Sequence, residues 1–525
     1  MVNLQEMDSK AQPPRPGSGS WRSFGGRRGP LTLCLSATAA FVVLLFAANG
    51  GTRGSDQFWY VADTETLLKG KPPLNNMVFP GLMLRGESSR DSMFFVHNSL
   101  ILHAVVPFAA LFGPHDGWIV FSALAAIGTA AIMYHLVFLL AGGWPAALSY
   151  TCYLLNPVTV WSTSNPLQEI SWGLVSAILL VLMIRARADR RSWALLSLAA
   201  TIAILCNPVY ILIALGVPCV RLFEQFRWPR ASDLLYISIA FAAAMLVNSQ
   251  KMNWLPDSAH PSVREIIIST IPGKTNLEWH YVEDIPPITL DLLWNKLVWA
   301  LGYQASTNHL AVFFAPINLT LIGTLLFACT QPRDYRSRRL LIGAAALVGL
   351  VAVIAFLHQN QFRYASVYLP ATISATVIGV SRVLRTAAQR KGAVIATALL
   401  IAGFLAVDLT AARYTRDEGL QSRRAIASLQ EAIASAEHVD RIWAEVSIGE
   451  SMLVAYAVRP RPCLSTRAGY QNDEQLRELL EVFDPDVLIC APDSRLLDLL
   501  QVSAVETELQ KPLKRFRVYE RLRTE

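Results

Sequence analysis

The chain has 525 residues, of which 53% are hydrophobic and only 16% are charged, against roughly 25% charged residues in an average soluble domain. A mean hydropathy of +0.36 over this length leaves more apolar surface than one globular core can bury. This excludes a soluble enzyme and indicates a polytopic membrane protein. The net charge of +7 does not indicate a nucleic-acid partner, because the Lys and Arg residues form short clusters between apolar runs.

The chain begins with a basic segment, residues 1–29, that is rich in Pro, Gly and Ser and predicts a disordered cytoplasmic tail. The apolar run 30–49 is too long for a signal-peptide core and predicts a retained first span. Residues 51–117 then lie outside the cytoplasm. With the later apolar runs we expect about eleven spans. The later runs are 118–140, 144–160, 170–184, 192–206, 208–222, 232–248, 308–329, 339–357, 364–384 and 392–410.

The distribution of basic residues supports this path, because short cytoplasmic loops are rich in Lys and Arg. It requires the apolar stretches 99–112 and 290–304 to lie on the membrane surface. At about 1.5 Å per residue they are too short for a hydrocarbon core of roughly 30 Å. Two long external loops result, 51–117 and 249–307. Four predicted cytoplasmic loops are basic, and they contain Arg185, Arg187, Arg190 and Arg191; Arg221, Arg227 and Arg230; Arg333, Arg336, Arg338 and Arg339; and Arg382, Arg385, Arg390 and Lys391.

The polar segment 411–525 predicts a small extracytoplasmic α/β domain. It has helical patterns at 416–437 and 473–482 and no catalytic motif. It contains two cysteines, Cys463 and Cys490, and the sequence does not decide whether they form a disulfide. Strand-like runs cover Arg441 to Ile448, Asp486 to Cys490 and Arg515 to Tyr519. The predicted fold class is therefore an all-α membrane bundle, residues 30–410, with interfacial helices in the two external loops and this α/β domain at the C-terminus.

An acidic helix opens the first external loop. Asp56, Tyr60, Asp63 and Leu67 follow helical spacing and share one face, so two carboxylates and a phenol line one side of a potential cavity. The alternative interpretation is that Ser55 or Asp56 caps an interfacial helix and that the other acids are solvated.

A second acidic position, Glu169, opens the apolar run after the third predicted span. Either the helix dipole stabilises it there, or it serves a site. A carboxylate at the edge of hydrocarbon is costly without a partner or a wet cavity, which favours the site. Arg363 lies at the external mouth of a later span, where it either snorkels or binds an anion. Further cations in the external loops are Arg85, Arg90, Lys274 and Lys296, for each of which a solvated surface charge is the favoured interpretation.

The order of these motifs resembles the glycosyltransferase C superfamily, especially bacterial enzymes similar to protein O-mannosyltransferases and aminoarabinose transferases. The first loop has Asp56, Tyr60 and Leu67-Leu68-Lys69-Gly70 where that family has Asp-Glu, Tyr and Leu-Leu-x-Gly, with Gln57 in place of the Glu. The interfacial helix ends in Leu111-Phe112-Gly113, and His97-Asn98 stands where the family has Lys-Pro or His-Pro. Glu169 occupies the second acidic position, and Arg363-Tyr364 with Pro370 matches a late Arg-Tyr motif.

The resemblance implies inverting transfer of a sugar from a polyprenyl-phosphate carrier to an extracytoplasmic glycolipid, polysaccharide or protein, in the bacterial inner membrane. Asp56 is the candidate base, and Glu169 either orients the acceptor or helps to hold a divalent cation, whose use stays open. Arg363 is the best-placed partner of the leaving phosphate. The candidate substrate-binding residues are Tyr60, Asp63, Arg85, Arg90, His97, Lys274, Arg363 and Tyr364.

Two other function classes compete with this interpretation. A secondary transporter or flippase of envelope precursors also has many spans, but such proteins place ionisable groups at the bilayer midplane and often repeat their architecture. The acidic candidates here cluster at one membrane face instead. The other class is a non-catalytic assembly subunit. Replacement of Asp56 by Asn distinguishes the two classes, because it should abolish sugar transfer only if the chain is an enzyme.

Overall fold

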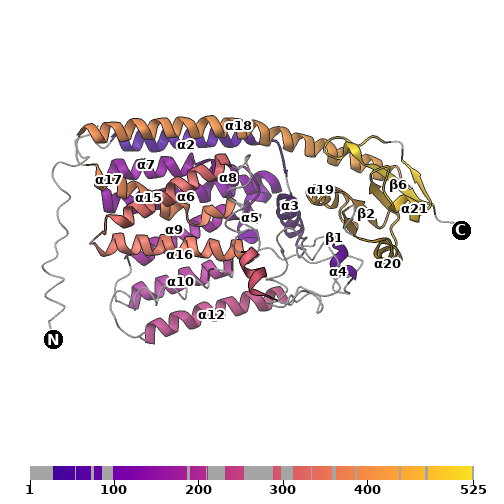
Figure 1. Ribbon diagram of the computed structural model, residues 1–525, viewed down its shortest axis with the longest axis horizontal. Helices are drawn as coiled ribbons and strands as arrows, with labels where there is room; N and C mark the ends of the chain where they lie inside the picture. The colour runs from indigo at the N-terminus through magenta and orange to yellow at the C-terminus, as the bar shows by residue number, and fades with distance from the viewer. Residues whose placement is uncertain are drawn as a thin grey trace.

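The computed structural model describes residues 28–53, 55–71, 76–84, 99–185, 190–207, 210, 231–252, 288–296, 311–332, 334–357, 362–384, 387–436, 439–467, 471–505 and 507–522. Long helices run alongside one another in a bundle, and a mixed sheet lies beyond one end of it (Figure 1). Helix α3 lies between the two (Figure 1).

Within the described residues, four helices are long and apolar enough to cross a membrane. They are α2 (Arg28–Ala48), α6 (Pro114–Ala141), the Tyr335–Ile354 part of α16 (Tyr335–Leu357), and the Lys391–Ala434 part of α18 (Ala387–Ala434). Further helices belong to the bundle. They are α5 (Ser99–Phe112), α9 (Glu169–Arg185), α10 (Arg190–Cys206), α12 (Ala231–Met252), α15 (Ala311–Cys329) and α17 (Leu369–Val383). The chain is an integral membrane protein.

Two predicted spans are interrupted at prolines. The run 144–160 divides into α7 (Gly143–Leu154) and α8 (Pro157–Thr163), because Pro157 cannot continue a helix but suits its first turn. The Asn156 side chain caps α8 by accepting a hydrogen bond from the Val158 amide at 3.0 Å. The run 364–384 begins as a 3-10 turn, η4 (Phe362–Val367), before α17 starts with Pro370 in its first turn. The second break places η4 next to α3, because Arg363 of η4 forms an ion pair with Asp56.

Other predicted runs follow the helices more closely. The stretch 99–112, predicted to lie on the membrane surface, is α5, which ends before Gly113 at a φ of +86°. The stretch 290–304 is helical through residue 296, and its remainder lies outside the described residues. The run 208–222 also lies outside them, apart from Tyr210.

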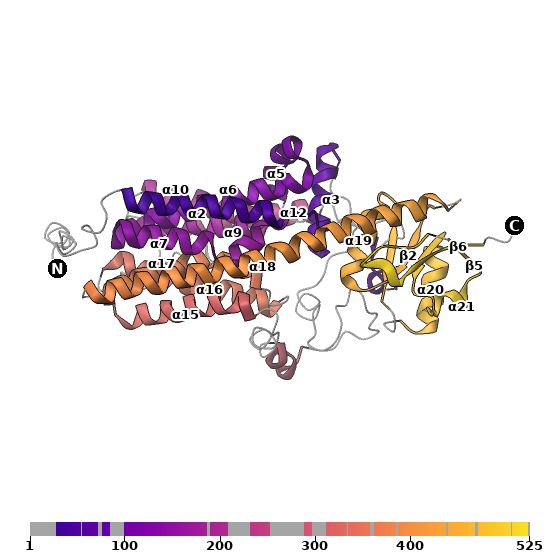
Figure 2. The same ribbon diagram turned by 90° about the horizontal axis from the view of Figure 1, so that it is seen from above.

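Helix α18 has 48 residues and lies beside α2 before it continues into the C-terminal sheet region (Figures 1 and 2). The chain crosses α18 just after α2 at a contact that only glycines allow. A Cβ atom on Gly50 would lie 2.1 Å from the Arg416 carbonyl oxygen, and one on Gly419 would lie 2.7 Å from the Gly50 carbonyl carbon. The boundary drawn at residue 411 falls inside this helix, so bundle and sheet share a continuous element.

The sheet has the strand order β1-β3-β2-β4-β6-β5. The first four strands in this order are parallel, whereas β6 is antiparallel to both β4 and β5. Helices α19 (Ile448–Val458) and α20 (Asp473–Phe483) connect the parallel strands. The strands are β1 (Met77–Val78), β2 (Ile442–Glu445), β3 (Cys463–Thr466), β4 (Val487–Cys490), β5 (Val502–Ala504) and β6 (Arg517–Arg521). Thus the three strand-like runs expected from the sequence overlap β2, β4 and β6.

Strand β1 belongs to the segment 51–117, which the sequence predicts to be external, and not to the C-terminal segment. It pairs with β3 in the register Met77–Cys463 and Val78–Leu464. The Asn76 side-chain amide donates hydrogen bonds to the carbonyl oxygens of Ala455 at 2.8 Å and Arg461 at 2.7 Å. The loop that contains the acidic helix is therefore anchored in the sheet.

The cysteines of the sheet do not form a disulfide. Cys463 and Cys490 are free and buried, and they lie on β3 and β4, which β2 separates. They also belong to the cores on opposite faces of the sheet. Burial raises the pKa of both thiols to about 12.

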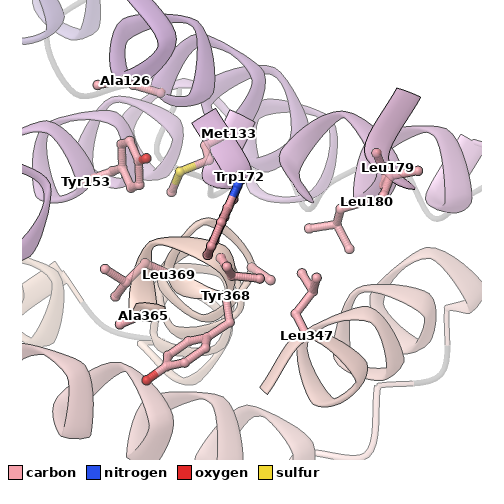
Figure 3. Packing of buried hydrophobic residues seen from close by; sticks show 14 of the residues in the cluster. Ala126, Met133, Tyr153, Trp172, Leu179, Leu180, Leu347, Ala365, Tyr368 and Leu369 are labelled. Atoms are coloured by element: carbon pink, nitrogen blue, oxygen red, sulfur yellow. The ribbon is translucent and has the colours of Figure 1, made fainter. Parts of the chain in front are cut away.

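The bundle core packs the start of α9 against η4 and α17. The Trp172 side chain points from α9 toward Tyr368 and Leu369, next to Met133 of α6 (Figure 3). This packing fixes the two elements that provide Glu169 and Arg363.

Candidate active site

Helix α3 (Ser55–Leu68) presents its acidic face to the bundle. Tyr60 is 3% and Asp63 is 2% exposed, and Leu67 packs at the edge of the bundle core. The Trp118 indole of α6 donates a hydrogen bond to the Thr64 hydroxyl at 2.8 Å, which fixes this face. The Asp56 side chain remains 29% exposed at the start of the helix. Tyr60 and Asp63 of the predicted face are therefore buried, and Asp56 at its start is partly exposed.

The other side of α3 packs on the C-terminal sheet. Phe58 lies in the core between the sheet, α18 and α19. Near the end of α3, Glu65 accepts a hydrogen bond from the Tyr456 hydroxyl at 2.7 Å and forms an ion pair with Arg459 at 2.7 Å. We call these three residues the docking cluster.

Asp56 and Glu169 meet through a single guanidinium. Glu169 is the first residue of α9 and its side chain is 1% exposed; Arg363 lies on η4 with its side chain 11% exposed. Arg363 Nε is 3.0 Å from Glu169 Oε1, and Arg363 Nη2 forms an ion pair with Asp56 Oδ2. We call Asp56, Glu169 and Arg363 the acid–arginine triad.

The triad contains two carboxylates for one fixed cation. Burial disfavours the charged guanidinium, but Glu169 and Asp56 outweigh it and raise the pKa of Arg363 well above its ordinary value. The guanidinium also lies over the Tyr364 ring, 5.5 Å from its centroid. Burial, Glu169 and Asp56 raise the pKa of the Tyr60 phenol, so it stays protonated and able to donate.

A glycine sets the distance between α9 and η4. A Cβ atom on Gly173 would lie 2.8 Å from the Ser366 carbonyl oxygen, closer than van der Waals contact allows. The Ser366 hydroxyl in turn donates a hydrogen bond to the Arg363 carbonyl oxygen at 2.7 Å. Gly173 thus permits the close approach that brings Arg363 to Glu169. A lone glycine in an apolar run carries no such signal in the sequence.

A second arginine, which sequence reasoning missed, supports the start of α3. Arg53 is 5% exposed and donates to the Asn165 side-chain oxygen at 3.0 Å, which also accepts a hydrogen bond from Gln57 at 2.9 Å. Arg53 forms an ion pair with Glu418 of α18 at 2.9 Å. Gln57, which replaces an acid of the family motif, is therefore part of a buried polar network. The position of Arg53 three residues before Asp56 is the available signal.

The remaining candidate cations do not add to the described site. Lys296 is buried in the helical residues 290–296, and burial lowers the pKa of its ammonium group. The other predicted substrate-binding residues, Arg85, Arg90, His97 and Lys274, lie outside the described residues.

The described residues of the site do not form a ligand set for a divalent metal ion. Among the residues that the structure describes, no group of three or more His, Cys, Asp or Glu side chains could hold a metal. The two candidate ligands, Asp56 and Glu169, instead bracket the positive charge of Arg363. A dication between these two carboxylates would be repelled by the Arg363 guanidinium.

Comparisons with known proteins identify the fold. No family model and no curated protein matches the sequence. The structure is similar to ArnT, an aminoarabinose transferase, from Cupriavidus metallidurans bound to undecaprenyl phosphate. The TM-score is 0.60 at 12% identity, and the match covers 95% of this chain and 99% of that one. The apo state of the same protein matches at a TM-score of 0.59 and 13% identity over 94% and 98% of the two chains.

A second solved fold is also similar. The archaeal oligosaccharyltransferase AglB from Archaeoglobus fulgidus, in complex with an inhibitory peptide and a dolichol-phosphate, matches at a TM-score of 0.53 and 12% identity. That match covers 90% of this chain and 70% of AglB. Both proteins belong to the superfamily that the sequence motifs resemble. The chain therefore has the glycosyltransferase C fold.

Proposed function

We propose that this chain is a membrane glycosyltransferase that moves a sugar from a polyprenyl-phosphate carrier to an extracytoplasmic acceptor. The observation that carries the proposal is the acid–arginine triad, in which a partly exposed carboxylate adjoins a buried guanidinium. One group suits a proton acceptor and the other a phosphate. The lipid phosphates present in the ArnT and AglB structures support a lipid-linked donor.

Asp56 is the proposed base. An acceptor hydroxyl is a poor nucleophile until a carboxylate takes its proton as attack develops. The acceptor oxygen forms a bond to the anomeric carbon while the bond from that carbon to the phosphate oxygen breaks. The bonding electrons leave with the polyprenyl phosphate, and a single displacement of this kind inverts the anomeric carbon. Asp56 is the more exposed of the two triad carboxylates, which supports its assignment to the acceptor.

Arg363 is the proposed partner of the leaving phosphate. Negative charge develops on the phosphate as the glycosidic bond breaks, and a preorganised cation in a poorly solvated site stabilises it strongly. Because the Glu169 side chain is 1% exposed, its supported role is to hold and orient Arg363 and not to touch the acceptor. Tyr60 and Tyr364 flank the triad and complete the proposed substrate-binding surface.

The proposed orientation has the site outside and the N-terminus inside the cytoplasm. Helix α9 begins with Glu169 at the site and ends with Arg185, and α17 follows η4 and has Arg382 in its last turn. The basic ends therefore lie at the membrane face opposite the triad. The positive-inside rule assigns those ends to the cytoplasm. For a polyprenyl-phosphate donor, the bacterial inner membrane is the proposed location.

Comparative mass spectrometry tests this function. Envelope glycolipids, polysaccharides and glycoproteins are compared between cells with the wild-type gene, cells without it, and cells that express Asp56→Asn at the same level. We expect one glycoconjugate to lose a sugar both in the deletion and in Asp56→Asn. The matched control is Asp417→Asn, which changes an exposed carboxylate on α18. Unchanged glycoconjugates in Asp56→Asn cells would overturn the assignment.

A further inference from the structure

We propose that Arg363 is the built-in cation of the acid pair, so that the site excludes a divalent metal ion and sugar transfer proceeds without one. The inference deepens the proposed function, and its claim about sugar transfer rests on that function. Its structural half, the exclusion of a dication from between Asp56 and Glu169, stands on the geometry of the chain alone.

The two carboxylates come from different elements and converge on one group. Asp56 approaches from α3 and Glu169 from α9, and they contact different nitrogens of the same guanidinium. A dication bound by this pair would lie next to the guanidinium, whose Nε is 3.0 Å from Glu169 Oε1. That positive charge cannot be removed, because arginine stays protonated in proteins. The pair can therefore serve Arg363 or a dication, but not both.

Arg363 is held in this position from several sides. The Ser366 hydroxyl bonds its carbonyl oxygen, and the close packing of Gly173 on Ser366 leaves η4 no room to approach α9 further. Its guanidinium lies on the Tyr364 ring, which stacks on Trp172 of α9 with ring centroids 6.2 Å apart. The guanidinium would have to leave the Tyr364 ring and the two carboxylates to make way for a metal ion.

The charge balance also suits a site without a metal. Two carboxylates and one guanidinium leave one negative charge, which a base needs in order to accept a proton. A dication added to the triad would reverse the sign and lower the basicity of Asp56. Asp56 is the more exposed of the two carboxylates, so it is the one that an incoming hydroxyl group can reach.

Binding of Mn²⁺ to the full-length chain in lipid nanodiscs tests the exclusion directly. After treatment with a chelator and its removal, Mn²⁺ is titrated and free Mn²⁺ is measured by electron paramagnetic resonance. We expect no Mn²⁺ bound in an Asp56-dependent manner to the wild type. Arg363→Met removes the internal cation. This variant should bind one Mn²⁺ per chain at least ten times more tightly than the wild type does. The double variant Arg363→Met with Asp56→Asn should lose that binding.

Two further variants keep the test falsifiable. Arg382→Met removes an arginine that is paired with Asp334 at 2.9 Å on another part of the bundle, and it should gain no Mn²⁺ site. Arg363→Lys keeps a cation and should still exclude Mn²⁺. If Arg363→Met does not fold, the wild type and Arg363→Lys still decide. Tight Mn²⁺ binding to the wild type that Asp56→Asn abolishes would overturn the proposal.

Transfer assays separate this inference from the function on which it rests. Wild-type transfer should continue at an unchanged rate in excess chelator. Transfer that stops with chelator and returns with Mn²⁺ would contradict the inference while leaving the glycosyltransferase assignment intact. If no sugar is transferred under any condition but the wild type binds no Mn²⁺, the glycosyltransferase assignment is wrong and the exclusion of the metal ion still holds.

Discussion

The two ends of α3 each carry an arginine–carboxylate cluster, and the clusters differ in burial and charge balance. The docking cluster joins Glu65 to one arginine and one phenol, with Arg459 20% and Glu65 26% exposed. In the acid–arginine triad, two carboxylates pair with one arginine, and the Glu169 side chain is almost completely buried. A neutral, partly solvated cluster suits the docking of two parts of a protein. Two carboxylates around one buried arginine are typical of a functional site.

Glu169→Gln should have the largest effect on stability. It removes the buried partner of Arg363 and leaves a desolvated cation with less compensation, which costs about 3 kcal/mol of unfolding free energy. Thermal unfolding in nanodiscs, followed by tryptophan fluorescence, measures the loss. Glu65→Gln is the matched control in the docking cluster and should lower the melting temperature much less. Equal losses in the two variants would remove the distinction between the clusters.

Gly173→Ala should disturb the triad without changing any charged group. Its methyl group would press against the Ser366 carbonyl oxygen, which costs about 1–3 kcal/mol through overpacking and shifts η4. We expect transfer to fall about tenfold, since small displacements of catalytic groups have large effects on rate. The control is Gly128→Ala on α6, where the added Cβ would meet a Leu174 methyl group at 3.4 Å. A wild-type rate in Gly173→Ala would refute the positioning argument.

Glu65→Gln should loosen the docking of α3 on the C-terminal sheet. Because both partners are partly exposed, the ion pair contributes only about 0.5–1 kcal/mol. Faster amide hydrogen exchange in the second half of α3 and in β1 should report the change, and transfer should stay within about threefold of the wild type. A loss of transfer as large as that of Asp56→Asn would place Glu65 in the catalytic machinery instead.

The smallest effect concerns the two cysteines of the sheet. Burial raises the pKa of Cys463 and Cys490 to about 12, so below that pH both remain neutral thiols, and the reactive thiolate fraction grows only as the pH rises toward 12. At neutral pH a maleimide should modify neither residue until the protein is denatured. Cys329 is exposed and serves as the control that labels in the native protein. Rapid labelling of Cys463 or Cys490 would contradict the burial of these strands.

The sequence predicts single elements of this molecule well, because each depends on local patterns. Apolar runs mark most bundle helices, and Asp56, Glu169 and Arg363 each stand at the expected end of an apolar or helical segment. Their convergence on one guanidinium requires packing across three distant segments, and periodicity does not report it. The breaks at Pro157 and Pro370 could have been predicted from proline chemistry, whereas hydropathy alone merged each into a longer span.

Three features lay beyond sequence reasoning. Strand β1 has two residues and forms only because the sheet supplies its partner, so Met77 and Val78 show no strand period. Gly173 acts through a contact with Ser366, which is distant in sequence. Arg53 acts through Asn165 and Glu418, so its network exists only once the bundle has assembled.

The most direct test compares the two ends of α3 in one assay. Single-turnover transfer from a radiolabelled polyprenyl-phosphate sugar is measured for wild type, Asp56→Asn and Glu65→Gln, each in nanodiscs at equal concentration. Loss of a general base lowers the rate by roughly 10²–10⁴-fold, so Asp56→Asn should fall into that range while Glu65→Gln stays close to wild type. Transfer by Asp56→Asn at the rate of Glu65→Gln would contradict the account.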